Sequence, residues 1–182
     1  MGLGFPGGPA VAAAAALATE PYRDLPRPMK GRPDCNFSFS GLKTALRQRV
    51  DALRAEGRFD DAARANLAAG FQQAVVDCLI DRCARAISIA KGDYPDLSAL
   101  VIAGGVAANQ HLRGQLQVLC ARHGIALLAP PGRLCTDNAA MIAWAGIERF
   151  RLGESSGFDF APRPRWPLDE QAPRLAGAGV KA

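Results

Sequence analysis

The chain has 182 residues, of which 49% are apolar, and it carries a formal net charge of +5. This length and apolar content suffice for a folded core and exclude a chain that is disordered throughout. No apolar run approaches the roughly 20 residues of a membrane span, and the mild basic excess allows a nucleic-acid partner without requiring one. The five cysteines form no CxxC pair and no zinc-like cluster, which indicates buried thiols in a reducing cytoplasm.

The first part of the chain predicts two helices and one strand around a proline-rich loop. Ala10–Leu17 is rich in alanine and predicts a helix; it is too short, and lacks the preceding basic residues, for a signal peptide. Pro21–Pro33 contains four prolines and predicts a loop. Cys35–Phe39 alternates apolar and polar residues, which is typical of a strand. A helix then runs from a cap at Ser40 or Gly41 to about Ala55, with apolar residues at helical spacing.

The next part predicts a long helix followed by a strand–helix–strand unit. Asp60–Ala90 carries one apolar stripe at helical spacing, and core packing explains that stripe fully. A strand, a helix, a second strand and another helix follow in that order: Ala99–Ala103, Ala107–His123, Ile125–Ala129 and Thr136–Phe150. Their short connections predict a right-handed βαβ unit with a parallel sheet, so the fold class is α/β and helix-rich. From Arg151 onward, Gly, Pro and Ser predict an irregular tail.

Two loops carry the residues best suited to chemistry. Gly104–Asn109 and Pro130–Asn138 each follow the carboxyl end of a predicted parallel strand, so we expect them to lie side by side at a ligand crevice. Each leads into a helix N-terminus, which favours phosphate or carboxylate groups. The Asn109 amide suits a nucleobase edge or a ribose, and Asp137 suits a hard metal or a sugar hydroxyl. Equally, the glycines can form only a turn, and Thr136 or Asp137 can serve only as a helix cap.

Other features leave two interpretations open. Glu20–Arg49 holds seven Lys or Arg residues and three acidic ones, which suits either a phosphate contact or a solvated loop. Asn36–Thr44 combines aromatic, hydroxyl and lysine side chains, and it suits either RNA or anion binding or a strand with buried aromatics. His111 and His123 are twelve residues apart, without the spacing of a metal motif, so we assign neither a function.

Four motifs occur in the order found in one known family: FPGGP near the start, NFSFSGLKTA, LVIAGGVAANQHLR and CTDNAAMIAWAG. Together they resemble the TsaD family over roughly Gly2–Gly153. The resemblance implies part of an actin/Hsp70/sugar-kinase-like ATPase fold, with the C-terminal portion in residues 1–153 and a tail in residues 154–182. It also implies transfer of the threonylcarbamoyl group from threonylcarbamoyl-adenylate to N6 of adenosine 37 in tRNAs that read ANN codons.

The same resemblance implies roles for particular residues. Gly8 and Asn109 match the positions that contact the adenylate, and Asp137 matches the aspartate that binds a divalent metal, iron or zinc. The family's HxxxH metal motif is not in this sequence, so we expect a C-terminal portion that is active only with the region carrying that motif. The alternative is an inactive fragment or a non-catalytic binding or scaffold module of the same fold. The resemblance identifies no catalytic acid or base, and its implied partners are tRNA and TsaB-type and TsaE-type proteins in the cytoplasm.

Overall fold

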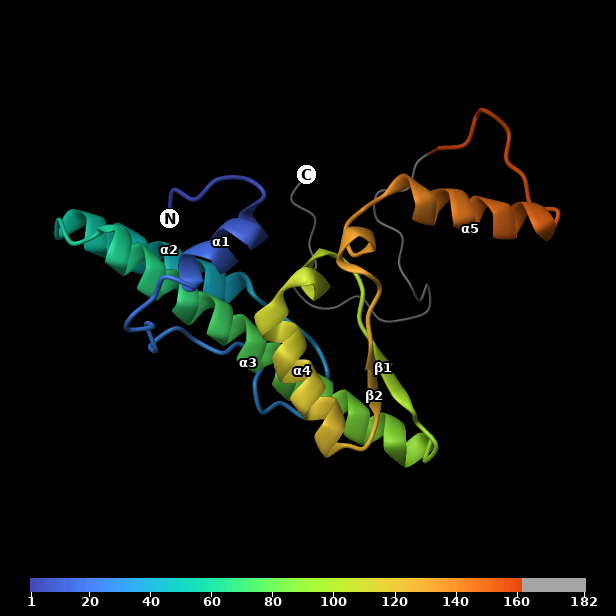
Figure 1. The fold of residues 1–182 in the computed structure, drawn as a ribbon, viewed down its shortest axis with the longest axis horizontal. Helices are drawn as coiled ribbons and strands as arrows, with labels where there is room; N and C mark the ends of the chain where they lie inside the picture. The colour runs from blue at the N-terminus through green and yellow to red at the C-terminus, as the bar shows by residue number, and fades with distance from the viewer. Residues whose placement is uncertain (162–182) are drawn as a thin grey trace. The chain divides into compact units, whose positions relative to one another are not determined.

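The computed structural model describes residues 1–161 of the chain, and these divide between two compact units. The first unit comprises Met1–Asn138, and the second begins at Ala139. The described elements, shown in Figure 1, are α1 (Gly7–Ala15), α2 (Ser40–Ala55), α3 (Asp61–Asp93), β1 (Ala99–Val101), the 3-10 turn η1 (Gly105–Ala108), α4 (Gln110–Arg122), β2 (Ala126–Leu128), the 3-10 turn η2 (Gly132–Leu134) and α5 (Ala139–Arg151).

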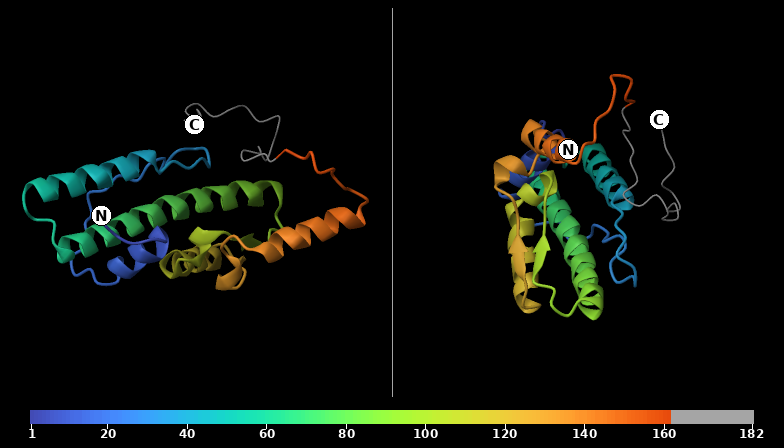
Figure 2. Two further views of the ribbon diagram at one scale, coloured as in Figure 1. Left: turned by 90° about the horizontal axis from the view of Figure 1, so that it is seen from above. Right: turned by 90° about the vertical axis from the view of Figure 1, so that its right-hand side faces the viewer.

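The long helix α3 is the central element of the first unit, because α1, α2 and α4 all pack against it. Asp60 caps its start, where the carboxylate accepts a hydrogen bond from the Ala63 N–H at 2.7 Å, as expected for an N-cap aspartate. α2 lies alongside α3 (Figure 2). Leu42 packs near Ala74, and Leu53 near Leu67, so the two helices run antiparallel.

The part of α3 from Val76 onward packs against α4 and the sheet through one apolar cluster. Its buried members come from α3, from α4 and from the residue just before β2: Val76, Ile87, Leu112, Leu116, Leu119, Cys120 and Ile125. The apolar stripe predicted for the long helix therefore serves core packing. Cys78, Cys120 and Cys135 are buried and all five cysteines are free thiols, which confirms the prediction of mostly buried thiols.

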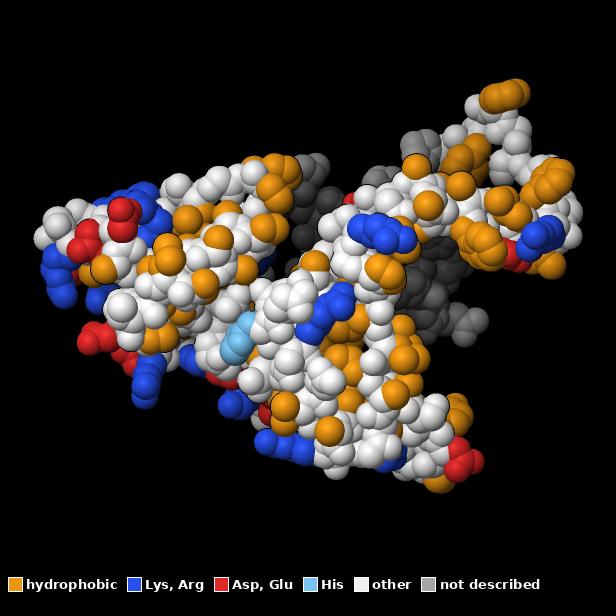
Figure 3. Space-filling model, in the orientation of Figure 1, with side chains coloured by type: hydrophobic (Ala, Val, Ile, Leu, Met, Phe, Trp, Pro, Cys, Tyr) orange, Lys and Arg blue, Asp and Glu red, His pale blue; other side chains and the backbone are white. Residues whose placement is uncertain are grey.

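The small sheet consists of β1 and β2, which pair in parallel with Ala99 opposite Ala126 and Val101 opposite Leu128. This confirms the predicted parallel sheet within a helix-rich fold. The strands are shorter than predicted. Their last residues are exposed to solvent, Val101 by 68% and Leu128 by 53%. Apolar side chains are visible on the surface over these strands in Figure 3.

Three local predictions are wrong. Cys35–Phe39 is not a strand, because within residues 1–161 only β1 and β2 pair. Neither Ser40 nor Gly41 is the N-cap of α2; Phe39 occupies that position and provides no side-chain hydrogen bond. The single helix predicted from Ala107 is instead η1 followed by α4, since the extended backbone of Asn109, with ψ of 116°, separates them.

The second unit is described through residue 161. α5 begins at Ala139, three residues later than predicted, and its apolar residues are exposed, including Ile142 and Trp144. Residues 154–161 form no helix or strand. The remainder of the predicted tail, residues 162–182, lies outside the described residues. Within residues 1–161, no helix combines the length and the apolarity that crossing a lipid bilayer requires.

Candidate functional site

The two loops predicted to form a crevice are joined by one side chain, that of Arg113. Its Nε donates to the Ala107 carbonyl of the first loop, and its Nη2 donates to the Pro130 carbonyl of the second at 3.2 Å. Nη2 also lies 3.2 Å from the Cys135 sulfur, which is buried. The loops at the carboxyl ends of β1 and β2 are therefore side by side, as predicted from the parallel strands.

Gly104 makes the sharp exit from β1 possible. Its backbone has φ of 82° and ψ of 172°, a conformation that is essentially restricted to glycine. The Ala107 N–H then donates to the Gly104 carbonyl at 3.0 Å, which closes the turn η1. Gly105 has an ordinary φ and open space where a Cβ would stand, so the two glycines of this loop have different roles.

Asn109 follows this turn and has two structural tasks. Its Oδ1 accepts from the Leu112 N–H at 2.9 Å, which caps α4, and its Nδ2 donates to Gln72 Oε1 at 2.9 Å, which ties the loop to α3. A primary amide offers two donor hydrogens and two acceptor lone pairs. One hydrogen and one lone pair of Asn109 therefore remain for a ligand, and the side chain is half-buried.

Asp137 stands in the second loop, two residues after Cys135, and is exposed. Within residues 1–161 there is no group of three or more His, Cys, Asp or Glu residues placed to hold a metal ion. The carboxylate of Asp137 is thus a single candidate ligand, and tight sites for transition metals use three or four protein ligands. The described residues alone do not fit a tight metal centre.

Gly8 lies in the exposed first turn of α1, and no hydrogen bond among the described residues joins it to either strand-end loop. A Cβ at Gly8 would meet nothing within 4 Å. Open space at this position permits a ligand to approach the backbone closely.

The basic proline-rich loop is docked on α3. Arg27 forms an ion pair with Asp77 at 2.9 Å, and its Nη1 donates to the Leu25 carbonyl at 2.6 Å. Arg82, only 2% exposed, donates to the carbonyls of Arg32 and Asp34 at 3.0 and 2.6 Å. Part of the local positive charge therefore has a structural task, which the pattern of charges did not reveal.

The two histidines have local contacts. His111 Nε2 lies 2.8 Å from Gln73 Oε1 on the exposed surface. His123 occupies the C-cap of α4, and its carbonyl accepts from Lys91 Nζ. In Asn36–Thr44, the Phe39 ring packs beside Leu25 and Leu42, whereas Phe37 is exposed.

Sequence reasoning missed Arg113, Gln72 and Arg82. Arg113 lies four residues after Asn109, which is one helical turn along α4. The sequence could therefore have predicted that its side chain lies near the strand-end loops. Gln72 and Arg82 lie 37 and 50 residues from the loop partners they contact. The sequence around them therefore gave no sign that these contacts form.

The chain matches the family model described as TsaD, tRNA N6-adenosine threonylcarbamoyltransferase, over residues 1–144. Curated relatives named tRNA N6-adenosine threonylcarbamoyltransferase are 53% identical in Rhodospirillum rubrum, 54% in a strain of Cereibacter sphaeroides and 52% in Novosphingobium aromaticivorans. The alignments cover 100% of this chain and 49–50% of each relative, so the chain spans about half the length of the curated relatives it matches. Because the family model covers well over half of the chain, this protein belongs to the TsaD family.

Proposed function

We propose that this chain forms part of a site that transfers the threonylcarbamoyl group from threonylcarbamoyl-adenylate to N6 of adenosine 37 in tRNAs reading ANN codons. The chain acts together with the region that corresponds to the other half of its relatives. The observation that carries the proposal is the bridge from Arg113 to both strand-end loops, because it brings the motifs of two family loops to one edge of the sheet.

In this proposal the adenylate lies across the two loops. The remaining amide hydrogen and lone pair of Asn109 face a polar edge of the adenylate, and Gly8 admits the ligand close to the α1 backbone. The Arg113 side chain acts as a positioning residue, because its hydrogen bonds hold the loops at a constant separation. A preformed pair of loops lowers the entropy cost of binding the adenylate.

The family resemblance also implies a divalent metal, iron or zinc, and Asp137 is the residue we propose as one of its ligands. One carboxylate in the described residues is too few for such a site, so the other ligands would come from outside them. We therefore derive no chemical step through the metal, and we assign no catalytic acid or base.

The proposed setting follows the family. The fold is part of an actin/Hsp70/sugar-kinase-like ATPase fold, the substrate is tRNA, and the protein partners are of TsaB and TsaE type in the cytoplasm. The names of the relatives support a tRNA substrate. The mild positive charge of the chain is compatible with it.

The test is reconstitution. The purified chain is assayed with threonylcarbamoyl-adenylate, a tRNA transcript, iron or zinc and the proposed TsaB-type and TsaE-type partners, both without and with the first half of the Rhodospirillum rubrum relative. Modified adenosine is measured by mass spectrometry. We expect modification in the mixture only; a folded mixture that forms a complex and modifies no adenosine would contradict the proposal.

A second candidate is a non-catalytic scaffold module. It is favoured by the lack of a group of three metal ligands within residues 1–161. A folded chain that binds tRNA or the other half of the protein without supporting transfer would point to this function.

A further inference from the structure

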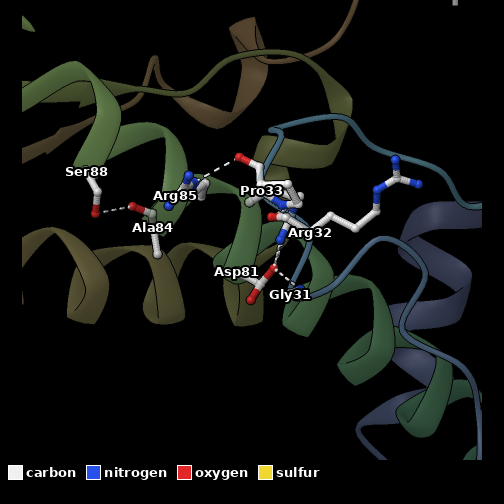
Figure 4. A pocket seen from close by; sticks show the side chains of 8 residues that line it. Gly31, Arg32, Pro33, Asp81, Ala84, Arg85 and Ser88 are labelled. Atoms are coloured by element: carbon white, nitrogen blue, oxygen red, sulfur yellow. Dashed lines mark hydrogen bonds and ion pairs between the residues drawn. The ribbon is translucent and has the colours of Figure 1, made fainter.

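An open cleft lies beside α3, apart from the two strand-end loops. Its walls are Gly31–Pro33 of the proline-rich loop and the stretch of α3 from Asp81 to Ser88, and its volume is about 450 Å³. Figure 4 shows these side chains around the cleft. It shares no lining residue with Gly104–Asn109 or Pro130–Asn138, so the roles proposed above leave it unexplained.

The loop wall of the cleft is held in one conformation. The buried Arg82 guanidinium binds the carbonyls of Arg32 and Asp34, and the Gly31 N–H donates to Asp81 Oδ2 at 3.0 Å. These bonds join residues about 50 positions apart in the sequence. The cleft is therefore present before any ligand arrives, which favours binding because little ordering entropy remains to be lost.

The acidic groups beside the cleft are already neutralised. Asp81 pairs with Arg82, and Asp34 pairs with Arg32 at 3.1 Å. Although burial opposes its ionisation, hydrogen bonds from Arg82 and from the Gly31 N–H hold the pKa of Asp81 below its ordinary value. Both carboxylates are thus paired with arginines, and Asp81 also attracts the nearby Lys30.

Two cations remain. The Nε of Arg85 donates to the Pro33 carbonyl at 3.0 Å, which holds the guanidinium at the edge of the cleft (Figure 4). Within residues 1–161, its two terminal nitrogens have no hydrogen-bond partner, and neither Arg85 nor the exposed Lys30 forms an ion pair. An arginine fixed at Nε presents its terminal nitrogens as a fork, and this fork matches two oxygens of a phosphate.

We propose that this cleft binds a backbone phosphate of tRNA through Arg85, with Lys30 as a second cationic contact. The inference rests on the proposed function, which supplies the RNA. Openness of the cleft suits a phosphate within a polymer that is also held elsewhere, whereas a free phosphate ion usually needs more enclosing donors. The surplus of positive charge in Glu20–Arg49 adds attraction over a wider surface, although Arg27 is already paired with Asp77 of α3.

The test is tRNA binding by the full 182-residue chain, measured by fluorescence anisotropy with a labelled tRNA transcript over a series of salt concentrations. The variants are Arg85→Gln, Lys30→Gln and the matched control Arg122→Gln. Arg122 is an exposed arginine in the last turn of α4. Each of the three variants therefore removes one positive charge from the surface. Lys30→Gln leaves every described hydrogen bond in place, which keeps the test valid if Arg85→Gln disturbs the loop.

We expect Arg85→Gln to weaken tRNA binding by about tenfold, and Lys30→Gln by a smaller factor. The slope of log affinity against log salt should fall by about one in each, with Arg122→Gln close to wild type. Equal effects in all three variants, or no tRNA binding by the wild-type chain at low salt, would overturn the inference.

Two further comparisons distinguish a tRNA contact from a small-anion site, and a failure of this inference from a failure of the proposed function. Binding of inorganic phosphate that depends on Arg85, with tRNA binding unchanged in Arg85→Gln, would show a site for a small anion and refute the tRNA contact. The readout is binding and not transfer. A failed reconstitution with a selective loss of tRNA binding in these variants would therefore refute the proposed function and leave the cleft assignment standing.

Discussion

Replacing Arg113 with methionine tests the bridge between the two strand-end loops. Methionine preserves much of the length of the side chain and removes its three polar contacts, to the Ala107 carbonyl, the Pro130 carbonyl and the Cys135 sulfur. The Pro130 carbonyl keeps a weak donor, because the Cys135 thiol lies 3.5 Å from it. The carbonyl of the buried Ala107 loses the Arg113 donor.

The size of the effect follows from these contacts. A buried acceptor without its partner costs about 1–3 kcal/mol, and a hydrogen bond from a charged donor contributes about 1.5–3 kcal/mol. Arg113 is only half-buried, so water replaces part of this loss. We therefore expect Arg113→Met to lower the free energy of unfolding by about 2–3 kcal/mol, with a larger effect on the second loop than on α3.

Two measurements check this expectation. Urea unfolding followed by circular dichroism gives the change in the free energy of unfolding. Hydrogen exchange reports the second loop through the amides of Leu134 and Cys135, which bond to carbonyls within that loop; their exchange should accelerate about tenfold or more.

The matched control is Arg122→Met, at the exposed end of the same helix, for which we expect a change within about 0.5 kcal/mol. An Arg113→Met variant that unfolds like this control, with unchanged exchange at Leu134 and Cys135, would refute the bridge as the feature that holds the loops together.

Three further predictions test single positions. Asp137→Ala in the reconstituted protein should reduce metal content and transfer while the circular dichroism spectrum stays unchanged; full metal content with full activity would remove Asp137 from the site. Asn109→Ala should weaken adenylate binding more than tRNA binding in titration calorimetry, and should also cost about 1 kcal/mol of stability from the lost helix cap. An equal loss for both ligands would mean that Asn109 acts only through the fold. Gly70→Ala should destabilise the protein by about 1–3 kcal/mol, because its new Cβ would lie 2.0 Å from the Tyr22 carbonyl oxygen. Gly114→Ala, whose Cβ would meet nothing within 4 Å, should instead stabilise it by up to about 1 kcal/mol in the same urea titration; stabilisation by both changes would contradict the close approach at Gly70.

Local pattern was sufficient for much of the fold. The spacing of apolar residues predicted α2 and α3 to within a few residues of their observed bounds, because helical periodicity is a local property of the chain. Two apolar runs around a helix predicted the parallel pairing of β1 with β2. The same order of elements placed the Gly104–Asn109 and Pro130–Asn138 loops together, since parallel strands end at one edge of a sheet.

Other features depended on partners distant in the sequence. Cys35–Phe39 has the alternation of a strand but no strand beside it among the described residues, so it has no ladder to join. Asn109 suited a ligand by its chemistry, and only the folded chain shows that Leu112 and Gln72 already use half of its amide.

The tertiary structure also decided which arginines are buried and which are exposed. The charge pattern identified a basic loop, and the fold divides its surroundings into the buried Arg82, which fastens the loop, and the exposed Arg85, whose terminal nitrogens point to no described partner. Periodicity and capping act over a few residues, so the chain shows them directly. Whether a cation is buried against carbonyls or left to a ligand is decided by residues about 50 positions away, which only the packed structure brings into contact.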